Sequence, residues 1–362
     1  MAGAVLILLL LLLVTGAIIF INTAPQFGQS PKGKHLEQIR NSPNYSKGAF
    51  QNPIHTTMGS FSEMMGTMPE FIFGKNREPD SELPVKYGKN QNPPYDSLCY
   101  VTWYGHSAFL IEMEGRRILI DPMLGKRPSP MPFGASRFPN EEPVPVELLT
   151  DIDMVILSHD HYDHLDYGTI MKLKDEVEHF YTALGVGSHL AAWGIPQHKI
   201  TELDWWQSAM TENIQLISCP ARHFSGRGLT DRNSTQWASW VLIGERTRIY
   251  FSGDSGYGPH FSEIGEKYGP FDFAMMECGQ YNQAWKDIHM MPEESVQAGI
   301  DVNARQVMPI HWGAFALSIH PWKDPIERFK KKSRELNVST VHPYIGERFQ
   351  LGNDFPDEVW WE

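Results

Sequence analysis

The chain has 362 residues, of which 41% are hydrophobic and 20% charged, and its formal net charge is −12. This composition is typical of a globular protein and excludes an intrinsically disordered one. The acidity disfavours a nucleic-acid partner, because proteins that grip a polyanion usually carry a basic surface.

The N-terminal residues 2–21 form an uninterrupted apolar run in which Thr15 is the only polar side chain. About 20 such residues are enough to cross a bilayer as a helix. A cleavable signal peptide usually has basic residues before a shorter apolar core, and no Lys or Arg precedes this run. We therefore predict a single-pass membrane anchor at residues 1–22. The basic residues Lys32 and Lys34 follow it and favour a cytoplasmic catalytic domain; a cleaved or exported form is the alternative.

Residues 23–98 are expected to form an irregular N-terminal region, because Pro, Gly and Asn recur there without a long helical or strand period. Within it, residues 58–66 predict a short helix. Its methionines would either pack into a core or meet lipid or substrate. The pattern changes at residue 99, and residues 99–362 are expected to form the main domain.

Alternating or continuous apolar runs bounded by turn residues predict a series of strands in this domain. The strands are expected at residues 100–104, 107–112, 117–120, 154–157, 214–218, 237–243, 248–251, 273–276 and 306–310. Helices are expected at residues 167–174, 292–300 and 325–336, the last two opening with proline. Strands followed by strands mixed with helices favour an α/β fold with two sheets flanked by helices.

A cluster of histidines and carboxylates directly follows the strand predicted at 154–157. It reads Ser-His-Asp-His-Tyr-Asp-His and occupies residues 158–164. Alternate residues at a strand exit can converge on one point. Imidazole and carboxylate groups without thiolate suit a catalytic zinc site better than a closed structural one. A solvated polar loop is the alternative, but the density of ligand atoms favours a metal site.

Three further candidate ligands stand at the ends of other predicted strands: His223, Asp254 and His311. Asp254 lies in a turn with glycine on both sides, which allows the backbone to bend sharply beside a ligand. Each residue alone would more often be a turn former or a histidine with ordinary hydrogen bonds. Together with the cluster at 158–164 they indicate a site for two metal ions.

Over residues 101–352 these motifs resemble the metallo-β-lactamase superfamily. The resemblance implies an αββα sandwich with two Zn²⁺ ions at one edge of its sheets. Carried over by position, one ion would be bound by His159, His161 and His223, the other by Asp163, His164 and His311, with Asp254 bridging them. Asp121 matches an acidic residue that supports the first ligand loop; from the residues alone it could equally be a turn former before Pro122.

A narrower set of motifs is similar to N-acyl-phosphatidylethanolamine-hydrolysing phospholipase D and its bacterial relatives. These are Thr-Trp-Tyr-Gly-His-Ser at 102–107, Cys-Pro-Ala-Arg-His at 219–223, Gly-Asp-Ser-Gly-Tyr at 253–257 and Ile-His-Trp-Gly at 310–313. The resemblance implies a di-zinc hydrolase in which a metal-bridging hydroxide attacks the phosphodiester of an N-acyl-phosphatidylethanolamine-like phospholipid. The apolar run at the N-terminus would anchor this hydrolase to a membrane. A homodimer of this protein is a possibility that the sequence leaves open.

Two further residues are expected to act on the substrate. His289 resembles a substrate-side histidine of the phospholipase and would donate to the substrate or leaving group. Arg227 lies between glycines just after His223, so it could reach the phosphodiester oxygens; the alternative is an ordinary solvated loop arginine.

The same superfamily includes other functions. A metal-dependent lactonase or phosphosugar hydrolase would use the same ions. A redox di-iron protein is disfavoured, because that variant carries Glu where this chain has His161. A metal-binding protein without catalysis is poorly explained by a complete ligand set.

Overall fold

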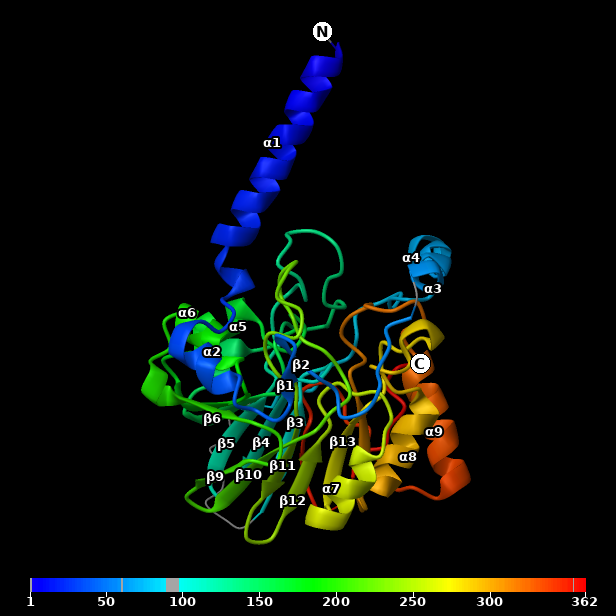
Figure 1. Ribbon diagram of the computed structural model, residues 1–362. Helices are drawn as coiled ribbons and strands as arrows, with labels where there is room; N and C mark the ends of the chain where they lie inside the picture. Colours follow the sequence, from blue (N-terminus) through cyan, green and yellow to red (C-terminus); the bar gives the residue numbers. More distant parts are fainter. Residues whose placement is uncertain (1, 60, 89–97, 354) are drawn as a thin grey trace.

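The computed structural model describes residues 2–59, 61–88, 98–353 and 355–362. Within them, two sheets pack face to face and helices cover the two outer faces (Figure 1). The predicted α/β class and the αββα sandwich are confirmed. Each sheet mixes antiparallel and parallel neighbours.

The seven-stranded sheet contains, in spatial order, β15 (Arg348–Gln350), β3 (Tyr100–Trp103), β4 (Phe109–Met113), β5 (Arg116–Ile120), β6 (Ile152–Leu157), β7 (Val177–Ala183) and β8 (Ile200–Leu203). The six-stranded sheet contains β14 (Val307–Ile310), β13 (Phe273–Glu277), β12 (Arg248–Phe251), β11 (Ser239–Ile243), β10 (Ile214–Cys219) and β9 (Ser208–Thr211). The helices of this part of the chain are α5 (Tyr167–Leu173), α6 (Gly187–Ala192), α7 (His260–Tyr268), α8 (Pro292–Asp301) and α9 (Asp324–Leu336). Short 3-10 turns are η2 (Val146–Leu148), η3 (Gln197–Lys199) and η4 (Gln283–Trp285).

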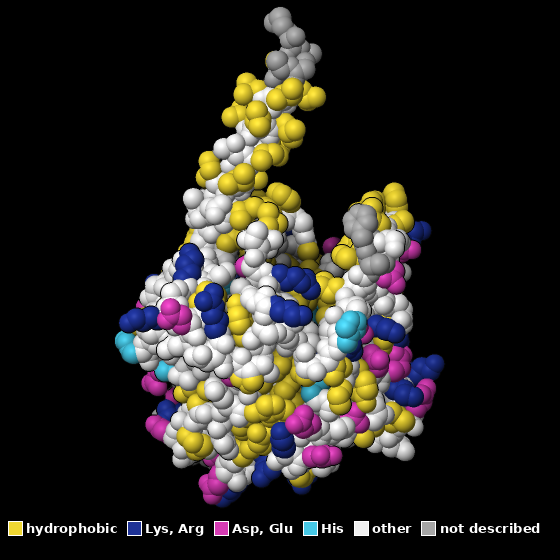
Figure 2. All heavy atoms as spheres, viewed as in Figure 1, with side chains coloured by type: hydrophobic (Ala, Val, Ile, Leu, Met, Phe, Trp, Pro, Cys, Tyr) yellow, Lys and Arg dark blue, Asp and Glu magenta, His cyan; other side chains and the backbone are white. Residues whose placement is uncertain are grey.

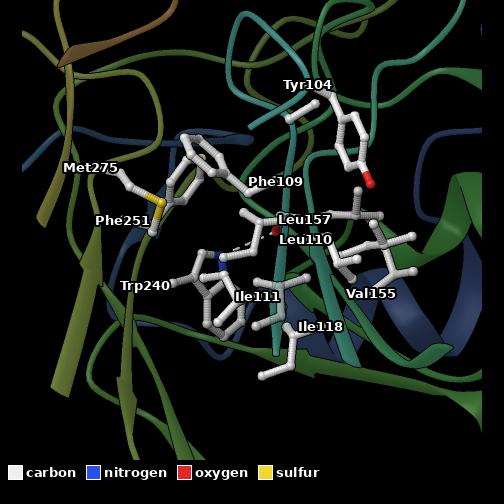
Figure 3. Packing of buried hydrophobic residues seen from close by; sticks show 14 of the residues in the cluster. Tyr104, Phe109, Leu110, Ile111, Ile118, Val155, Leu157, Trp240, Phe251 and Met275 are labelled. Carbon is white, nitrogen blue, oxygen red and sulfur yellow. Dashed lines mark hydrogen bonds between the residues drawn. The ribbon is translucent and has the colours of Figure 1, made fainter. Parts of the chain in front are cut away.

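The core lies between the sheets, where apolar side chains of both interdigitate (Figure 3). Phe109 of β4 meets Phe251 of β12 edge to face, with ring centroids 6.4 Å apart. Trp240 of β11 donates its indole N–H to the carbonyl of Leu157 at 3.3 Å, across the gap between the sheets. This bond fixes the end of β6 at the point where the histidine cluster begins.

The N-terminal part contains α1 (Ala2–Thr23), η1 (Pro25–Phe27), α2 (Gly33–Ile39), the hairpin β1 (Tyr45–Ser46) and β2 (Ala49–Phe50), α3 (Phe61–Gly66) and α4 (Met68–Phe73). The helices and strands that follow α1 in this region are therefore short. Ile39 and Phe50 are fully buried in the same core as the sheets, so this region packs on the main domain.

Helix α1 projects away from the sandwich (Figure 1). None of its apolar side chains is buried over residues 5–23, whose side chains the structure describes. Residues Val5–Thr23 are long and apolar enough to cross a bilayer. An N-terminal signal sequence passes the same test of length and apolarity, so the helix fits either one.

Candidate metal centre and substrate pocket

The predicted metal ligands come from loops that leave the carboxyl ends of four strands. Residues 159–164 follow β6, and His223, Asp254 and His311 follow β10, β12 and β14. Because these strand ends lie along one edge of the sandwich, side chains far apart in the sequence meet there. The structure brings all seven predicted ligands together in two groups that could each hold a metal ion.

The first group joins three imidazoles. Nδ1 of His161 lies 2.9 Å from Nε2 of His159 and 3.2 Å from Nε2 of His223. His159 and His223 are fully buried and His161 is half-buried. Three ring nitrogens that point at one another in a buried space form a ligand set rather than an efficient hydrogen-bond network.

The second group contains Asp163, His164 and His311, and the structure adds His106 to it. Oδ2 of Asp163 is 3.7 Å from Nε2 of His164 and 3.9 Å from Nε2 of His311. His106, fully buried, places its Nε2 2.9 Å from the same oxygen. His106 lies in the motif at residues 102–107, whose sequence indicates no role for it; in the structure it orients the Asp163 carboxylate.

The Asp254 carboxylate lies between the two groups. Its Oδ2 is 3.1 Å from Nε2 of His164 and 3.7 Å from Nε2 of His223. Its Oδ1 is buried and lies 3.2 Å from Nδ1 of His311, but it accepts no hydrogen bond from the residues that the structure describes. A buried carboxylate oxygen without a hydrogen bond is costly. A cation held by either group would offset that cost.

Asp121 and Ser158 hold the first loop from behind. The carboxylate of Asp121 accepts the Ser158 backbone N–H at 2.7 Å and lies 2.7 Å from Nδ1 of His164. The second bond leaves Nε2 of His164 as the nitrogen that faces Asp254 and fixes the ring's orientation. Asp160, between the ligands, faces the other way and accepts from the Gly226 N–H and the Thr235 hydroxyl, each at 2.8 Å.

Backbone strain is concentrated at the same place. His106, Asp121 and His311 have φ angles of 56°, 40° and 67°, in the left-handed region that side chains with a Cβ rarely adopt. The loops of His106 and His311 stabilise each other, because His106 donates its N–H to Trp312 and accepts that of His311, both at 2.9 Å. Such strain is characteristic of sites whose geometry is imposed by the surrounding structure.

Burial keeps the three imidazoles of the first group neutral, whereas at His164 burial is outweighed by the carboxylates of Asp254, Asp163 and Asp121, which raise its pKa well above the usual value. Burial lowers the pKa of His161 to about 4 and that of His159 and His223 well below the usual value. Burial also raises the pKa of Asp254 to about 6. Since a metal competes with protons for these nitrogens, neutral imidazoles at physiological pH are prepared to coordinate one.

His289 stands at the open side of the centre and is paired with Glu277. Nδ1 of His289 is 2.7 Å from Oε1 of Glu277, which is fully buried at the end of β13. The other carboxylate oxygen accepts the Met290 N–H at 3.0 Å. Burial lowers the pKa of His289 and raises that of Glu277. Because Nδ1 is engaged, Nε2 is the ring nitrogen available to the pocket. The contribution of Glu277 was missed from the sequence.

Arg227 is not placed as the sequence suggested. It is buried, and its guanidinium donates to backbone carbonyls: to Gln26 at 2.7 and 3.1 Å, to Asp160 at 2.5 Å and to Leu165 at 2.9 Å. The same group lies over the Tyr162 ring at 4.0 Å. These bonds use four of the five N–H donors and hold the buried group on backbone carbonyls, so it is not placed to serve a phosphodiester. The expectation that Arg227 contacts substrate does not fit this geometry; the residue supports the ligand loop.

Replacing Arg227 by leucine is therefore expected to cost about 3 kcal/mol of unfolding free energy, because three buried carbonyls lose a charged donor. Zinc should bind more weakly, and activity at a fixed zinc concentration should fall equally on phosphodiester and lactone substrates. Arg227→Lys is the matched control that keeps the charge without the planar fork. Thermal melts, zinc titration and rates on both substrates measure the effect. A loss confined to phosphodiesters, with zinc affinity unchanged, would restore the substrate role.

An apolar pocket of about 430 Å³ opens onto the centre. Its floor includes His161, Asp163, Asp254, His289 and His311. Its walls are Met58, Met64, Met65, Met68, Phe71, Phe224, Trp285, Ile288 and Leu317, with Thr67 and Gln280. The methionines predicted to pack in a core or meet a ligand thus border the site: Met58 lies before α3, and Met64 and Met65 lie on it. No Lys or Arg occurs among the described residues that line the pocket.

Comparisons with known proteins agree with this architecture. The profile described as "Beta-lactamase superfamily domain" matches residues 116–312. The chain is 39% identical over 327 residues to an uncharacterised protein of Mycobacterium tuberculosis, a match that covers 88% of this chain and 87% of the relative. It is 34% identical over 266 residues to N-acyl-phosphatidylethanolamine-hydrolyzing phospholipase D 1 of Caenorhabditis elegans, covering 70% of this chain and 74% of the relative.

Among solved structures, Igni18, a metallo hydrolase from the archaeon Ignicoccus hospitalis, superposes with a TM-score of 0.54 at 20% identity, covering 71% of this chain and all of that one. This likeness concerns the fold. With the ligand-bearing loops at the expected edge of the sandwich and the profile matching more than half of the chain, the protein belongs to the metallo-β-lactamase superfamily and is a relative of the N-acyl-phosphatidylethanolamine-hydrolysing phospholipases D.

Proposed function

We propose that the protein is a membrane-anchored zinc-dependent hydrolase that cleaves a phospholipid diester on its head-group side. The observation that supports this most directly is the pocket, whose methionine-rich apolar walls end on two groups of metal-ligand side chains. A phospholipid has the same division, with apolar chains attached to one anionic phosphodiester. The name of the C. elegans relative favours an N-acyl-phosphatidylethanolamine as substrate class.

Two zinc ions fit the donor set of imidazole and carboxylate groups. One would be held by His159, His161 and His223, the other by Asp163, His164 and His311, with Asp254 shared. Bound there, they would supply Lewis acidity toward a phosphoryl oxygen and lower the pKa of a water molecule to about 7.

The chain's own residues orient the substrate and handle a proton. Hydrolysis joins the oxygen of water to phosphorus and breaks the bond from phosphorus to the head-group oxygen, which takes up a proton as it leaves. His289 faces the pocket with Nε2, while Glu277 holds Nδ1 at 2.7 Å. With a proton held between Glu277 and Nδ1, Nε2 carries the other ring proton and can donate it to the leaving oxygen or to a phosphoryl oxygen.

The apolar walls give the site its specificity. Met64, Met65 and Phe71 can pack along an acyl chain and exclude water from the reacting phosphate. A sugar phosphate monoester is a poorer fit, because it carries more charge and no Lys or Arg lies among the described lining residues. We also propose that α1 is the anchor and that the domain lies in the cytoplasm, since Lys32 and Lys34 follow α1.

A substrate panel in water enriched with ¹⁸O tests the proposal. The zinc-loaded full chain in lipid nanodiscs is offered N-acyl-phosphatidylethanolamine, phosphatidylethanolamine, a sugar phosphate and a long-chain lactone. We expect phosphatidic acid that carries ¹⁸O, an alcohol product without it, and the fastest turnover on a phospholipid. A lactone cleaved fastest, with no phosphatidic acid formed, would replace the phospholipase by a lactonase.

A further inference from the structure

Exposed large hydrophobic side chains gather on the side of the molecule from which α1 projects. Ile72 and Phe73 of α4 are 64% and 77% exposed, and two loop residues, Phe133 and Leu229, are 67% and 82% exposed. Figure 1 places α3, α4 and the loops drawn in teal and yellow-green on that side, and Figure 2 shows the apolar tip of the α3–α4 hairpin on the same side as the apolar α1, separated from it by a gap. We call these four residues the apolar rim.

The base of α1 is fastened to the metal-ligand loop, so the helix has a defined direction relative to the pocket. The carbonyl of Gln26 accepts from Arg227, which also holds Asp160. The carbonyl of Pro25 accepts from the Trp193 indole at 2.7 Å. A bilayer that α1 crosses would consequently meet the rest of the protein on the side that carries the apolar rim.

The pocket opens on this same side. Its walls include Met64, Met65, Met68 and Phe71, the residues of α3 and α4 next to the apolar rim. The charged side chains on this side of the molecule also suit contact with a lipid surface. Lys and Arg side chains, dark blue in Figure 2, lie between the base of α1 and the hairpin, although the chain carries a net charge of −12. Basic groups at this level are attracted to lipid phosphates.

We propose that this side is a docking face for the bilayer that α1 crosses: the apolar rim inserts among the lipid head groups and the pocket mouth opens at the bilayer surface. The inference rests on the proposed function for the membrane anchor. A phospholipid could then slide from the bilayer along the methionine wall with its chain in apolar surroundings throughout. Elsewhere on the molecule, Met210 of β9 and Ile300 of α8 are exposed but belong to neither α1 nor the rim.

Depth measurements on the full chain in phospholipid vesicles test the docking face. The three native cysteines are buried, so an introduced one can be labelled selectively. Ile72→Cys and Phe133→Cys carry an environment-sensitive fluorophore, and Met210→Cys is the matched control at an equally exposed position. We expect quenching by doxyl-labelled lipids at positions 72 and 133 and none at 210. A label at 72 that behaves like the one at 210 overturns the proposal. Excimer emission from pyrene at 72 would identify a second copy of the chain as the occupant and also overturn it.

A kinetic comparison separates this proposal from the proposed function. The double variant Ile72→Ser, Phe73→Ser changes neither the ligands nor the residues that line the pocket. We expect its KM for phospholipid in vesicles to rise about tenfold with kcat unchanged, while Met210→Ser has no effect. An unchanged KM counts against the docking face even if the lipid is hydrolysed. Lipid quenching at 72 with no phospholipid hydrolysis by the native chain would leave the docking face standing and reject the phospholipase.

Discussion

Replacing Asp254 by asparagine is expected to lower hydrolysis by on the order of 10³–10⁴-fold and to leave fewer than two zinc ions per chain. Asparagine keeps the size of the side chain but removes the charge shared by both ligand groups, 3.1 Å from His164 and 3.7 Å from His223. Loss of the second ion would remove about 5 kcal/mol of transition-state stabilisation. Elemental analysis and rates on a phospholipid measure both effects. Two retained zinc ions, or an active variant, would contradict the bridging role.

The stability of the metal-free protein distinguishes the role of Asp254 from that of the neighbouring Asp160. Burial raises the pKa of Asp254 to about 6, so the metal-free fold disfavours its charge and Asp254→Asn should not lower metal-free stability at pH 7. Burial alone would also raise the pKa of Asp160, but His189 and the Gly226 N–H outweigh it and hold this pKa far below the usual value. The stabilisation by Asp160 is therefore present above about pH 4 and is lost as the pH falls.

Asp160→Asn is the matched comparison. It should cost about 2–3 kcal/mol with or without zinc, because a buried charged acceptor is lost. Asp254→Asn should instead lose only the rise in melting temperature that zinc produces in the native chain. Melts of both variants in detergent, with zinc and with a chelator, measure the difference. Equal behaviour of the two variants would mean that Asp254 is a structural carboxylate.

The strands that carry the ligands were predictable because most are buried on both faces. Residues 154–157 of β6, 249–251 of β12 and 307–310 of β14 are continuous apolar runs, and a polar residue follows each. The missed strands β8, β9 and β15 lie at sheet edges, where half-exposed positions blur the apolar pattern. β7 was missed for a related reason: Glu178 and His179 interrupt its apolar run.

The roles that could not be predicted depend on contacts between distant loops. His106 orients Asp163 from 57 residues away, and nothing in the local sequence of either indicates the contact. Arg227 lies 201 residues from Gln26. A guanidinium in a glycine-flanked loop can serve a substrate or a carbonyl equally well, and only the position of the segment that follows α1 decides between them. Ligand types at strand ends are a local property, whereas the groups that orient them are a property of the tertiary fold.

Removal of the His289 imidazole is expected to lower phosphodiester turnover by on the order of 10²-fold without loss of zinc. The expected size corresponds to one charge-assisted hydrogen bond, about 3 kcal/mol, to a phosphoryl or leaving oxygen in the transition state. His289 lies close enough to Asp254 and His311 to be a ligand itself. Zinc content therefore decides its role: His289→Ala with native zinc supports a substrate-facing histidine, and a lost ion would make it a ligand.

Glu277 is expected to act only through His289, as a positioning residue. Glu277→Gln should lower kcat about tenfold with little change in KM, because it weakens the 2.7 Å contact that directs Nε2 into the pocket. In the double variant Glu277→Gln, His289→Ala, the loss of kcat should be no greater than in His289→Ala alone, since the effects of residues that act as one unit are not additive. Glu294→Gln is the control: its carboxylate caps α8 through the Met291 N–H at 2.9 Å, outside the pocket lining, and its kcat should be native. A further tenfold loss in the double variant would show that Glu277 supports the fold of the site independently of His289.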